Sequence, residues 1–167
     1  NKLVTMIDDS GDVNVYVTYT GDLITKLEYK DPNGTIDQVD SFTYNSNSKL
    51  ATFTRQVTSA NLGTFIDSKE VYTYNADGSI SVEEESRSRS TSTIKFVNNE
   101  VSEIIHSNPS ESHTYAYDVK NNPTKNILGW GKISFYGGEA DGILLNIISD
   151  PNSKQSYNYT YIYNSNN

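Results

Sequence analysis

The strongest constraint on this chain is a short phrase that recurs along it, in which two aromatic residues flank one other residue and a turn sequence follows. Aromatic and β-branched residues favour a pleated, half-buried strand. Asn, Asp and Gly tolerate the positive φ that tight hairpin turns require. Each phrase is therefore typical of a strand that ends in a hairpin. The four clear copies are Phe42-Thr43-Tyr44-Asn45, Tyr72-Thr73-Tyr74-Asn75, Tyr115-Ala116-Tyr117-Asp118 and Tyr161-Ile162-Tyr163-Asn164.

Alternation between these phrases also favours strands over helices. Val13, Val15 and Val17 would share one face of a strand, and Tyr157 to Tyr163 form a strict period-2 ladder. No window of about a dozen residues shows the 3.6-residue period of an amphipathic helix. Only residues 139–149 are ambiguous, because they could form either a short helix or a buried strand.

The spacing of the turns indicates about 12 strands, a plausible number for an all-β protein of this length. So many antiparallel strands would expose an apolar face and two edges if they stayed in one open layer. We therefore predict a single all-β, repeat-like domain over residues 1–167, an antiparallel up-and-down meander closed or flattened into a barrel. A two-layer β-sandwich is the alternative.

Polar residues dilute the apolar stripes of the predicted strands, which favours a soluble form with no membrane span. Thr25, Gln56 and Glu103 lie on such stripes, and the Ser- and Arg-rich residues 86–92 have no apolar face. A charged side chain facing lipid at mid-membrane costs about 2–4 kcal/mol for a base and less for an acid.

Composition excludes several classes of function. The chain has no Cys, which excludes disulfide frameworks, zinc–thiolate sites, iron–sulfur clusters and cysteine nucleophiles. Its formal net charge of −8 argues against nucleic acid as a partner. Tyrosine is unusually frequent, with 13 Tyr against 5 Phe. What is left is a Tyr-rich, polar-surfaced domain.

Two phrases resemble a known group of proteins. Residues 72–78 and, above all, 115–130 resemble uncharacterised secreted and lipoprotein-type proteins of the Bacteroides–Flavobacterium group, and the wider pattern is similar to YD (Rhs-type) repeats of bacterial surface proteins. One such domain family is described as having a porin-like fold. The resemblance implies a porin-like barrel, export to the periplasm or cell surface, and a lipid anchor on a Cys that would lie upstream of Asn1. It brings no catalytic or binding residues with it.

The best candidates for ligand binding are aromatic residues: Trp130, Tyr157, Tyr159 and Tyr161 could stack on a sugar ring or another extended ligand. The competing interpretation is packing across strands or filling of the interior. We expect no cofactor and no metal. His106 and His113 flank one turn without a fixed third ligand, and the oxygens of residues 8–12 do not follow the EF-hand pattern.

No catalytic motif occurs in the sequence: it contains no Gly-x-Ser-x-Gly elbow, no P-loop and no dinucleotide fingerprint. We therefore expect an exported binding or structural module of the cell envelope without catalytic activity. Its partner would be a glycan, a peptide or a small molecule. The alternatives are a carrier that uses the barrel interior for a small molecule or glycan, and a hydrolase of envelope or dietary polymers.

Overall fold

The structure is a computed structural model that describes residues 1–7, 13–85, 89–151 and 157–163, and the acidic residues 8–12 lie outside this range. Ten strands form one antiparallel sheet in strict sequence order, from β1 to β10. They are β1 (Thr5–Ile7), β2 (Asn14–Thr20), β3 (Leu23–Lys30), β4 (Ile36–Tyr44), β5 (Leu50–Ser59), β6 (Gly63–Tyr74), β7 (Ile80–Glu84), β8 (Ser90–Val97), β9 (Glu100–His106) and β10 (His113–Thr114).

Three further strands form a second antiparallel sheet in the order β11-β12-β13. They are β11 (Ala116–Asn121), β12 (Leu145–Asp150) and β13 (Tyr157–Asn158). The predicted all-β antiparallel meander is thus confirmed, with 13 strands in the described residues where the turns indicate about 12. Of the ambiguous residues 139–149, the second half forms strand β12 and no part is helical.

Hairpin turns end the strands after two of the four aromatic phrases, at residues 42–45 and 72–75, as predicted. The prediction is wrong for the phrase at 115–118, where β11 continues to Asn121 and no hairpin follows, and the fourth phrase ends outside the described residues. After β4, the side chain of Asn45 accepts hydrogen bonds from the backbone N–H of Asn47 and Lys49, at 2.9 and 3.1 Å. After β6, Gly78 takes φ +88°, and the Asp77 carboxylate accepts from Ser79 N at 3.0 Å. Such side-chain bonds to the backbone fix a turn locally, so the sequence determines the register of these hairpins.

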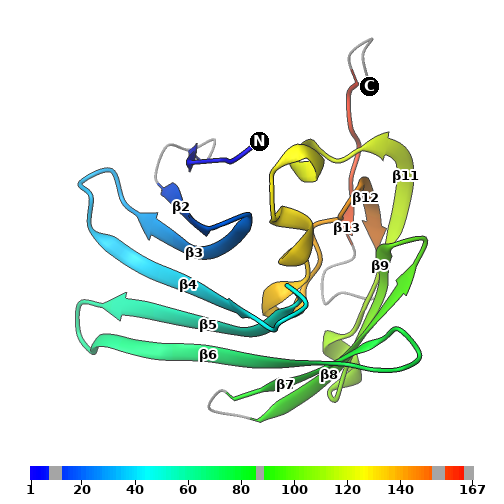
Figure 1. Cartoon of the computed structure of the whole chain (residues 1–167), viewed down its shortest axis with the longest axis horizontal. Helices are drawn as coiled ribbons and strands as arrows, with labels where there is room; N and C mark the ends of the chain where they lie inside the picture. Colours follow the sequence, from blue (N-terminus) through cyan, green and yellow to red (C-terminus); the bar gives the residue numbers. More distant parts are fainter. Residues whose placement is uncertain (8–12, 86–88, 152–156, 164–167) are drawn as a thin grey trace.

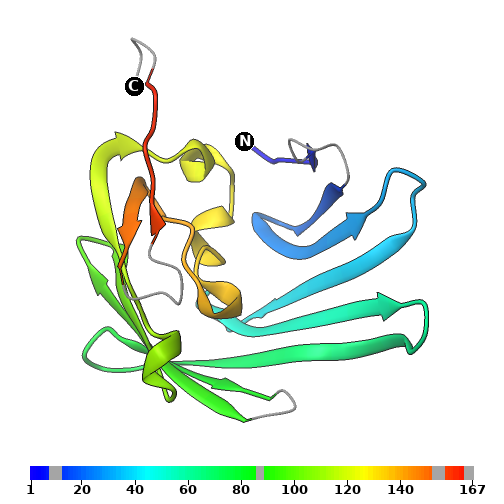
Figure 2. The same cartoon turned by 180° about the vertical axis from the view of Figure 1, so that it is seen from behind.

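The ten-stranded sheet is strongly curved but open. Figures 1 and 2 show it curling around the chain that follows β11. Its outermost strands, β1 and β10, do not pair with each other in the described residues. The sheet is therefore not closed into a barrel as expected. Instead, the chain that follows β11 fills the open curve and buries the apolar face of the sheet.

The filling is what we call the inner segment, residues 123–143, which the sequence analysis did not predict. It contains three short 3-10 helices, η2 (Pro123–Asn126), η3 (Trp130–Lys132) and η4 (Tyr136–Gly138). A fourth, η1 (Pro109–Glu111), lies between β9 and β10. Gly129 lets the segment approach the sheet, because a Cβ there would lie 2.9 Å from the carbonyl oxygen of Asp22 and φ is +80°.

The core lies between the concave face of the sheet and the inner segment. Phe42 and Phe53, on β4 and β5, contact the ring of Tyr136, with centroids 5.0 and 4.8 Å away. The ring of Phe135, also in the inner segment, contacts the rings of Tyr72 and Phe96 in the same way. The aromatic positions of the hairpin phrases therefore supply the inward face of the sheet.

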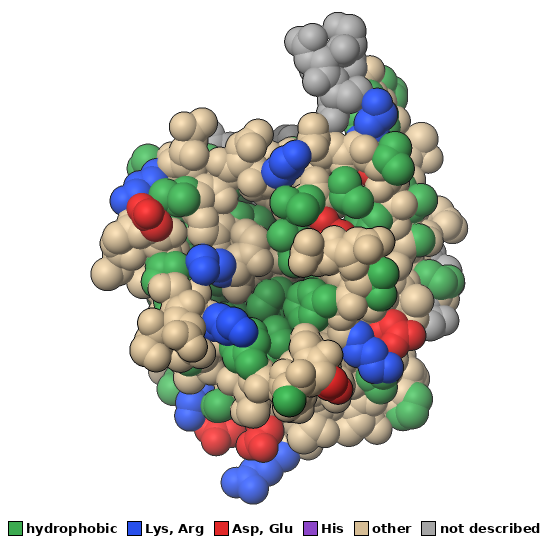
Figure 3. All heavy atoms as spheres, turned by 45° about the vertical axis from the view of Figure 1, so that its right-hand side comes forward, with side chains coloured by type: hydrophobic (Ala, Val, Ile, Leu, Met, Phe, Trp, Pro, Cys, Tyr) green, Lys and Arg blue, Asp and Glu red, His purple; other side chains and the backbone are tan. Residues whose placement is uncertain are grey.

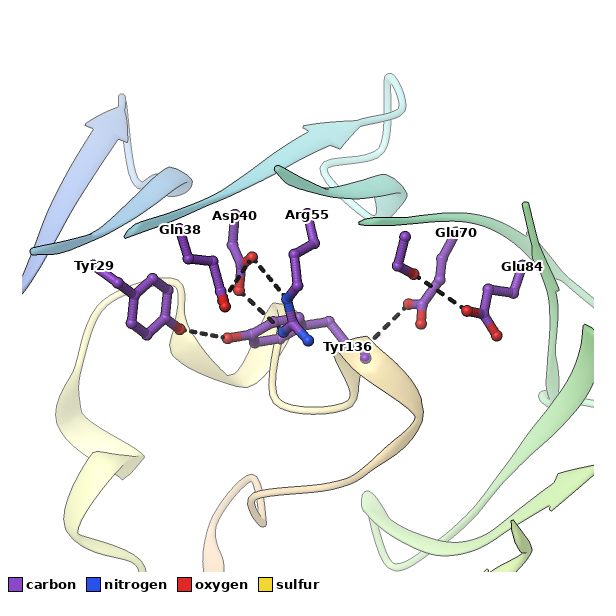
Figure 4. A network of polar contacts seen from close by, with 9 residues as sticks. Tyr29, Gln38, Asp40, Arg55, Glu70, Glu84 and Tyr136 are labelled. Carbon is purple, nitrogen blue, oxygen red and sulfur yellow. Dashed lines mark hydrogen bonds and ion pairs between the residues drawn. The ribbon is translucent and has the colours of Figure 1, made fainter. Parts of the chain in front are cut away.

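A belt of polar side chains crosses this concave face from strand to strand (Figure 4). The Arg55 guanidinium donates to both carboxylate oxygens of the fully buried Asp40, at 3.1 and 3.2 Å. Glu70 accepts from the Tyr72 hydroxyl and, at 3.1 Å, from the backbone N–H of Gly137. The remaining members are Tyr29, Gln38, Ser68, Glu84 and Ser90.

The belt holds the inner segment in place. Besides the bond from Gly137, the hydroxyls of Tyr29 and Tyr136 lie 3.1 Å apart. Farther along, the buried carboxylate of Glu100 accepts from three successive backbone N–H groups of residues 143–145, at 2.6 to 2.9 Å. These bonds satisfy backbone groups that have no strand partner, as a buried irregular segment requires.

Candidate ligand-binding site

The last described residues of the chain carry an exposed row of tyrosines, which we call the tyrosine ladder: Tyr157, Tyr159, Tyr161 and Tyr163. Strand β13 pairs with β12 through Ser149↔Asn158 and Asp150↔Tyr157, and Tyr159 N continues the pairing to the Ile148 carbonyl at 2.8 Å. The rings stack in pairs, with centroids 5.9 Å apart for Tyr157 and Tyr159 and 6.1 Å for Tyr161 and Tyr163.

Tyr157, Tyr159 and Tyr161 of the ladder line a pocket of about 600 Å³, which we call the aromatic pocket. That volume lies within the roughly 300–1,000 Å³ typical of small-molecule sites. A second part of the lining comes from β10 and the residue after it, where the rings of His113 and Tyr115 stack almost in parallel at 5.7 Å. The full lining is Glu111, His113, Tyr115, Glu139, Ala140, Asp141, Ile147, Asp150, Tyr157, Tyr159 and Tyr161.

A hydrogen-bonded pair joins the two sheets at the base of the pocket. His113 Nδ1 lies 2.5 Å from Asp150 Oδ2, and the backbone N–H of Thr114 donates to the other oxygen of the same carboxylate at 3.2 Å. Asp150 is 4% exposed. This arrangement fixes the imidazole of His113, and with it the stacked ring of Tyr115, so one wall of the pocket is rigid.

The pocket is acidic: Glu111, Glu139, Asp141 and Asp150 line it, and among the described residues no Lys or Arg does. The pKa of the Tyr115 hydroxyl is raised, first by burial and then by the nearby carboxylates, Asp150 foremost. The pKa of Tyr159 is raised too, by burial first and then by its neighbouring tyrosines and by Glu139 and Asp150. The hydroxyls of both tyrosines therefore keep their protons at neutral pH.

The structure brings three of the four residues singled out in the sequence into this pocket. Tyr157, Tyr159 and Tyr161 are 44%, 45% and 38% exposed and line it. Trp130 lies elsewhere, in the core under the ten-stranded sheet, where it is 7% exposed. Its indole Nε1 has no hydrogen-bond partner among the described residues.

The part of the pocket formed by His113 and Tyr115 was not predicted from the sequence. His113 drew attention only as a partner of His106, and their rings do meet, with centroids 6.0 Å apart. His106 Nε2 lies 3.3 Å from the Gly138 carbonyl oxygen, however, and His113 is engaged by Asp150. Among the residues described, no group of three or more His, Asp or Glu side chains is arranged to hold a metal ion.

Comparisons with known proteins give little beyond the fold. No protein family matches the chain, and no curated protein does so. Among solved structures, it is similar to a porin-like protein from Bacteroides uniformis, with a TM-score of 0.48 and 14% sequence identity. The alignment covers 86% of this chain and 73% of the other. In the described part of the chain, no helix combines the length and apolarity needed to span a bilayer.

Proposed function

We propose that this chain is a non-enzymatic binding module and that its ligand is a glycan held in the aromatic pocket. The observation that carries the proposal is that the exposed, stacked Tyr157 and Tyr159 and the fixed pair of His113 and Tyr115 line the same pocket of about 600 Å³. Flat, rigid aromatic rings provide contact area at low entropic cost.

The chemistry of the lining suits a sugar. The carbon face of a sugar ring is apolar and can lie against a tyrosine ring, while its hydroxyls donate to carboxylates at the rim. The carboxyl groups of the exposed residues Glu111, Glu139 and Asp141 provide such acceptors. Because the charged residues that line the pocket in the described part of the chain are all acidic, a neutral glycan fits better than a sulfated or uronic one.

The test is a screen of neutral and acidic oligosaccharides on an array, followed by calorimetry. We expect a neutral glycan to bind, and Tyr159→Ala and Tyr161→Ala each to weaken its binding by about five- to tenfold, in line with aromatic contacts of about 1–1.5 kcal/mol. Tyr16→Ala is a matched control, because Tyr16 is 39% exposed on β2 and does not line the pocket. No binding across the screen, or equal loss in the control, would contradict the proposal.

One observation favours a hydrolase as the second candidate. Glu139, Asp141 and Asp150 come from two separated stretches of chain and line one pocket, and paired carboxylates across a cleft are what glycoside hydrolysis needs. Incubating the protein with the bound glycan and analysing the products tests this idea. Release of shorter sugars that Asp141→Asn abolishes would favour the hydrolase over the binding module.

The location of the protein and its anchor stay predictions. We propose an exported module of the cell envelope on the strength of the sequence resemblance in residues 72–78 and 115–130. The upstream anchor Cys and the relation to YD repeats rest on the same resemblance.

A further inference from the structure

A second hollow lies at the end of the curved sheet where the hairpin turns after β4, β6 and β8 come together. Its volume is about 440 Å³. Figure 3 shows this end of the molecule: hydrophobic side chains line the hollow, and basic side chains stand at its rim. The lining residues are Ser48, Lys49, Leu50, Tyr74, Gly78, Ile80, Phe96, Asn99, Gly131, Lys132, Phe135 and Ile143, none of which lines the aromatic pocket.

The interior of this hollow is apolar because it is the uncovered end of the core. Leu50 and Ile80 begin β5 and β7 and are almost fully buried. Phe135 of the inner segment forms part of the lining and packs edge-on against Phe96, with ring centroids 5.8 Å apart. Removing such a surface from water is favourable by roughly 25 cal/mol per Å².

The charges at the rim are of one sign. Among the described residues, Lys49 and Lys132 are the only charged ones that line the hollow, and both side chains lie beside the turn that follows β4. Lys132 Nζ donates to the carbonyl oxygen of Ser48 at 2.8 Å, and Lys49 Nζ lies 4.5 Å from the centroid of the Tyr74 ring.

These two ammonium groups differ from three lysines of the ten-stranded sheet. Lys26, Lys69 and Lys95 each form an ion pair with a glutamate. Within the described residues Lys49 and Lys132 form no ion pair, although the whole chain carries a net charge of −8. An apolar hollow with two cations at its rim is complementary to an anion that carries an apolar tail.

We propose that this hollow binds a free amphiphilic carboxylate of the medium-chain fatty-acid class. Its tail fills the apolar hollow, and its carboxylate accepts hydrogen bonds from the ammonium groups of Lys49 and Lys132. The site is separate from the aromatic pocket and does not depend on the glycan proposal.

Calorimetry with four probes tests the chemistry of the ligand: decanoate, decanol, decyltrimethylammonium and acetate. Decanoate is expected to bind more tightly than each of the others, because only it offers both a tail and a negative charge. In the double variant Lys49→Gln/Lys132→Gln we expect decanoate affinity to fall about tenfold, towards that of decanol. Lys26→Gln is the matched control and should leave the affinity unchanged.

A variant of the hollow itself tests the apolar part. Gly131→Leu should fill the space, since a Cβ at Gly131 would already lie 3.1 Å from the Ile143 side chain, and φ there is not positive. We expect it to abolish decanoate binding with both lysines still in place. Chemical unfolding of each variant checks that the fold is kept.

Several results would overturn the proposal. They are equal affinity for decanol or decyltrimethylammonium, full affinity in the double lysine variant or in Gly131→Leu, and no binding of decanoate to the wild type. Binding to vesicles of anionic phospholipid without binding of monomeric decanoate would assign the hollow to a membrane surface instead. Loss of decanoate binding in Tyr159→Ala would move the ligand to the aromatic pocket.

Discussion

The same aromatic pattern plays opposite parts in the two sheets. In the ten-stranded sheet, Tyr72 is 6% exposed, packs against Phe135 and donates its hydroxyl to Glu70. Directly after β13 of the three-stranded sheet, Tyr159 is 45% exposed and, among the described residues, stacks on its neighbour Tyr157. The difference is the layer above them, because the inner segment covers the first face and no described residue covers the second in that way. Alternation sets which face is aromatic, and the covering layer decides whether that face is core or surface.

Charged groups follow the same division. Asp40 and Arg55 pair inside the curved sheet, whereas Lys69 and Glu85 pair at 2.9 Å with side chains 40% and 57% exposed. Lys69 lowers the pKa of Glu85 through its hydrogen bond and charge. Losing a solvent-exposed ion pair costs little stability, because each charge stays hydrated. When one member of a buried ion pair is removed, the charge left behind stays buried without hydration, and the fold loses much more stability.

The largest effect we expect comes from breaking the buried pair. Arg55→Met would leave the Asp40 carboxylate fully buried with only Gln38 to donate to it, so the free energy of unfolding should fall by about 3–5 kcal/mol. Urea unfolding measures the change. Lys69→Met is the control, since Glu85 stays in water, and its change should be far smaller. Equal midpoints for both variants would contradict the assignment of the belt as a structural layer.

A smaller effect should follow from removing one hydroxyl from the inner face. Tyr72→Phe keeps the ring but leaves Glu70 with the Gly137 N–H as its remaining donor, which should cost about 1–3 kcal/mol. Tyr157→Phe, on the ladder, is the matched change at an exposed ring. If both variants lost the same stability in urea unfolding, burial would not be what separates the two sets of tyrosines.

Much of the sheet could be predicted from the sequence because its signals are local. The turns at Asn45 and Asn75 are fixed by side chains two to four residues away, and the period-2 pattern places Phe42 and Tyr72 on one face. The inner segment has no such signal. Pro123, Gly129 and the pair Gly137-Gly138 interrupt any period, and what holds the segment comes from distant strands, as Glu70 and Glu100 show.

The candidate site, too, could be predicted only in part from the sequence. The ladder is a run of alternate residues, so it could be recognised in the sequence. His113 and Tyr115 join the same pocket through a contact between residues far apart in the sequence, because Asp150, 37 residues along the chain, binds His113. The sequence around Trp130 does not indicate whether its side chain is buried, since a tryptophan beside glycines fits a surface turn as well as a core.

The next prediction concerns pH and tests whether Glu70 belongs to the interior. Burial, and after it the charge of Glu84, raises the pKa of Glu70 above its ordinary value of 4.5, although bonds from Tyr72 and Gly137 oppose the shift. The folded state then binds more protons than the unfolded state in the window above pH 4.5, so this residue's contribution to stability falls as pH rises through it. Glu70→Gln removes the titration. In urea unfolding, the free energy of unfolding of the variant relative to that of the wild type should rise from pH 4 to pH 7. A difference that stays constant over this range would contradict the raised pKa of Glu70.

The smallest effect on stability is expected on the ladder. Tyr159→Ala removes a ring that is 45% exposed while keeping the backbone bond to Ile148, so the free energy of unfolding should change by no more than about 0.5 kcal/mol. Tyr16→Ala, on β2, provides the comparison at nearly equal exposure. If Tyr159→Ala lost as much stability as Tyr72→Phe, the ladder would be a packing element, and its exposure would no longer argue for a ligand. A stable variant that has lost glycan binding would instead show that these tyrosines are retained for contact with a partner, because the fold does not need them.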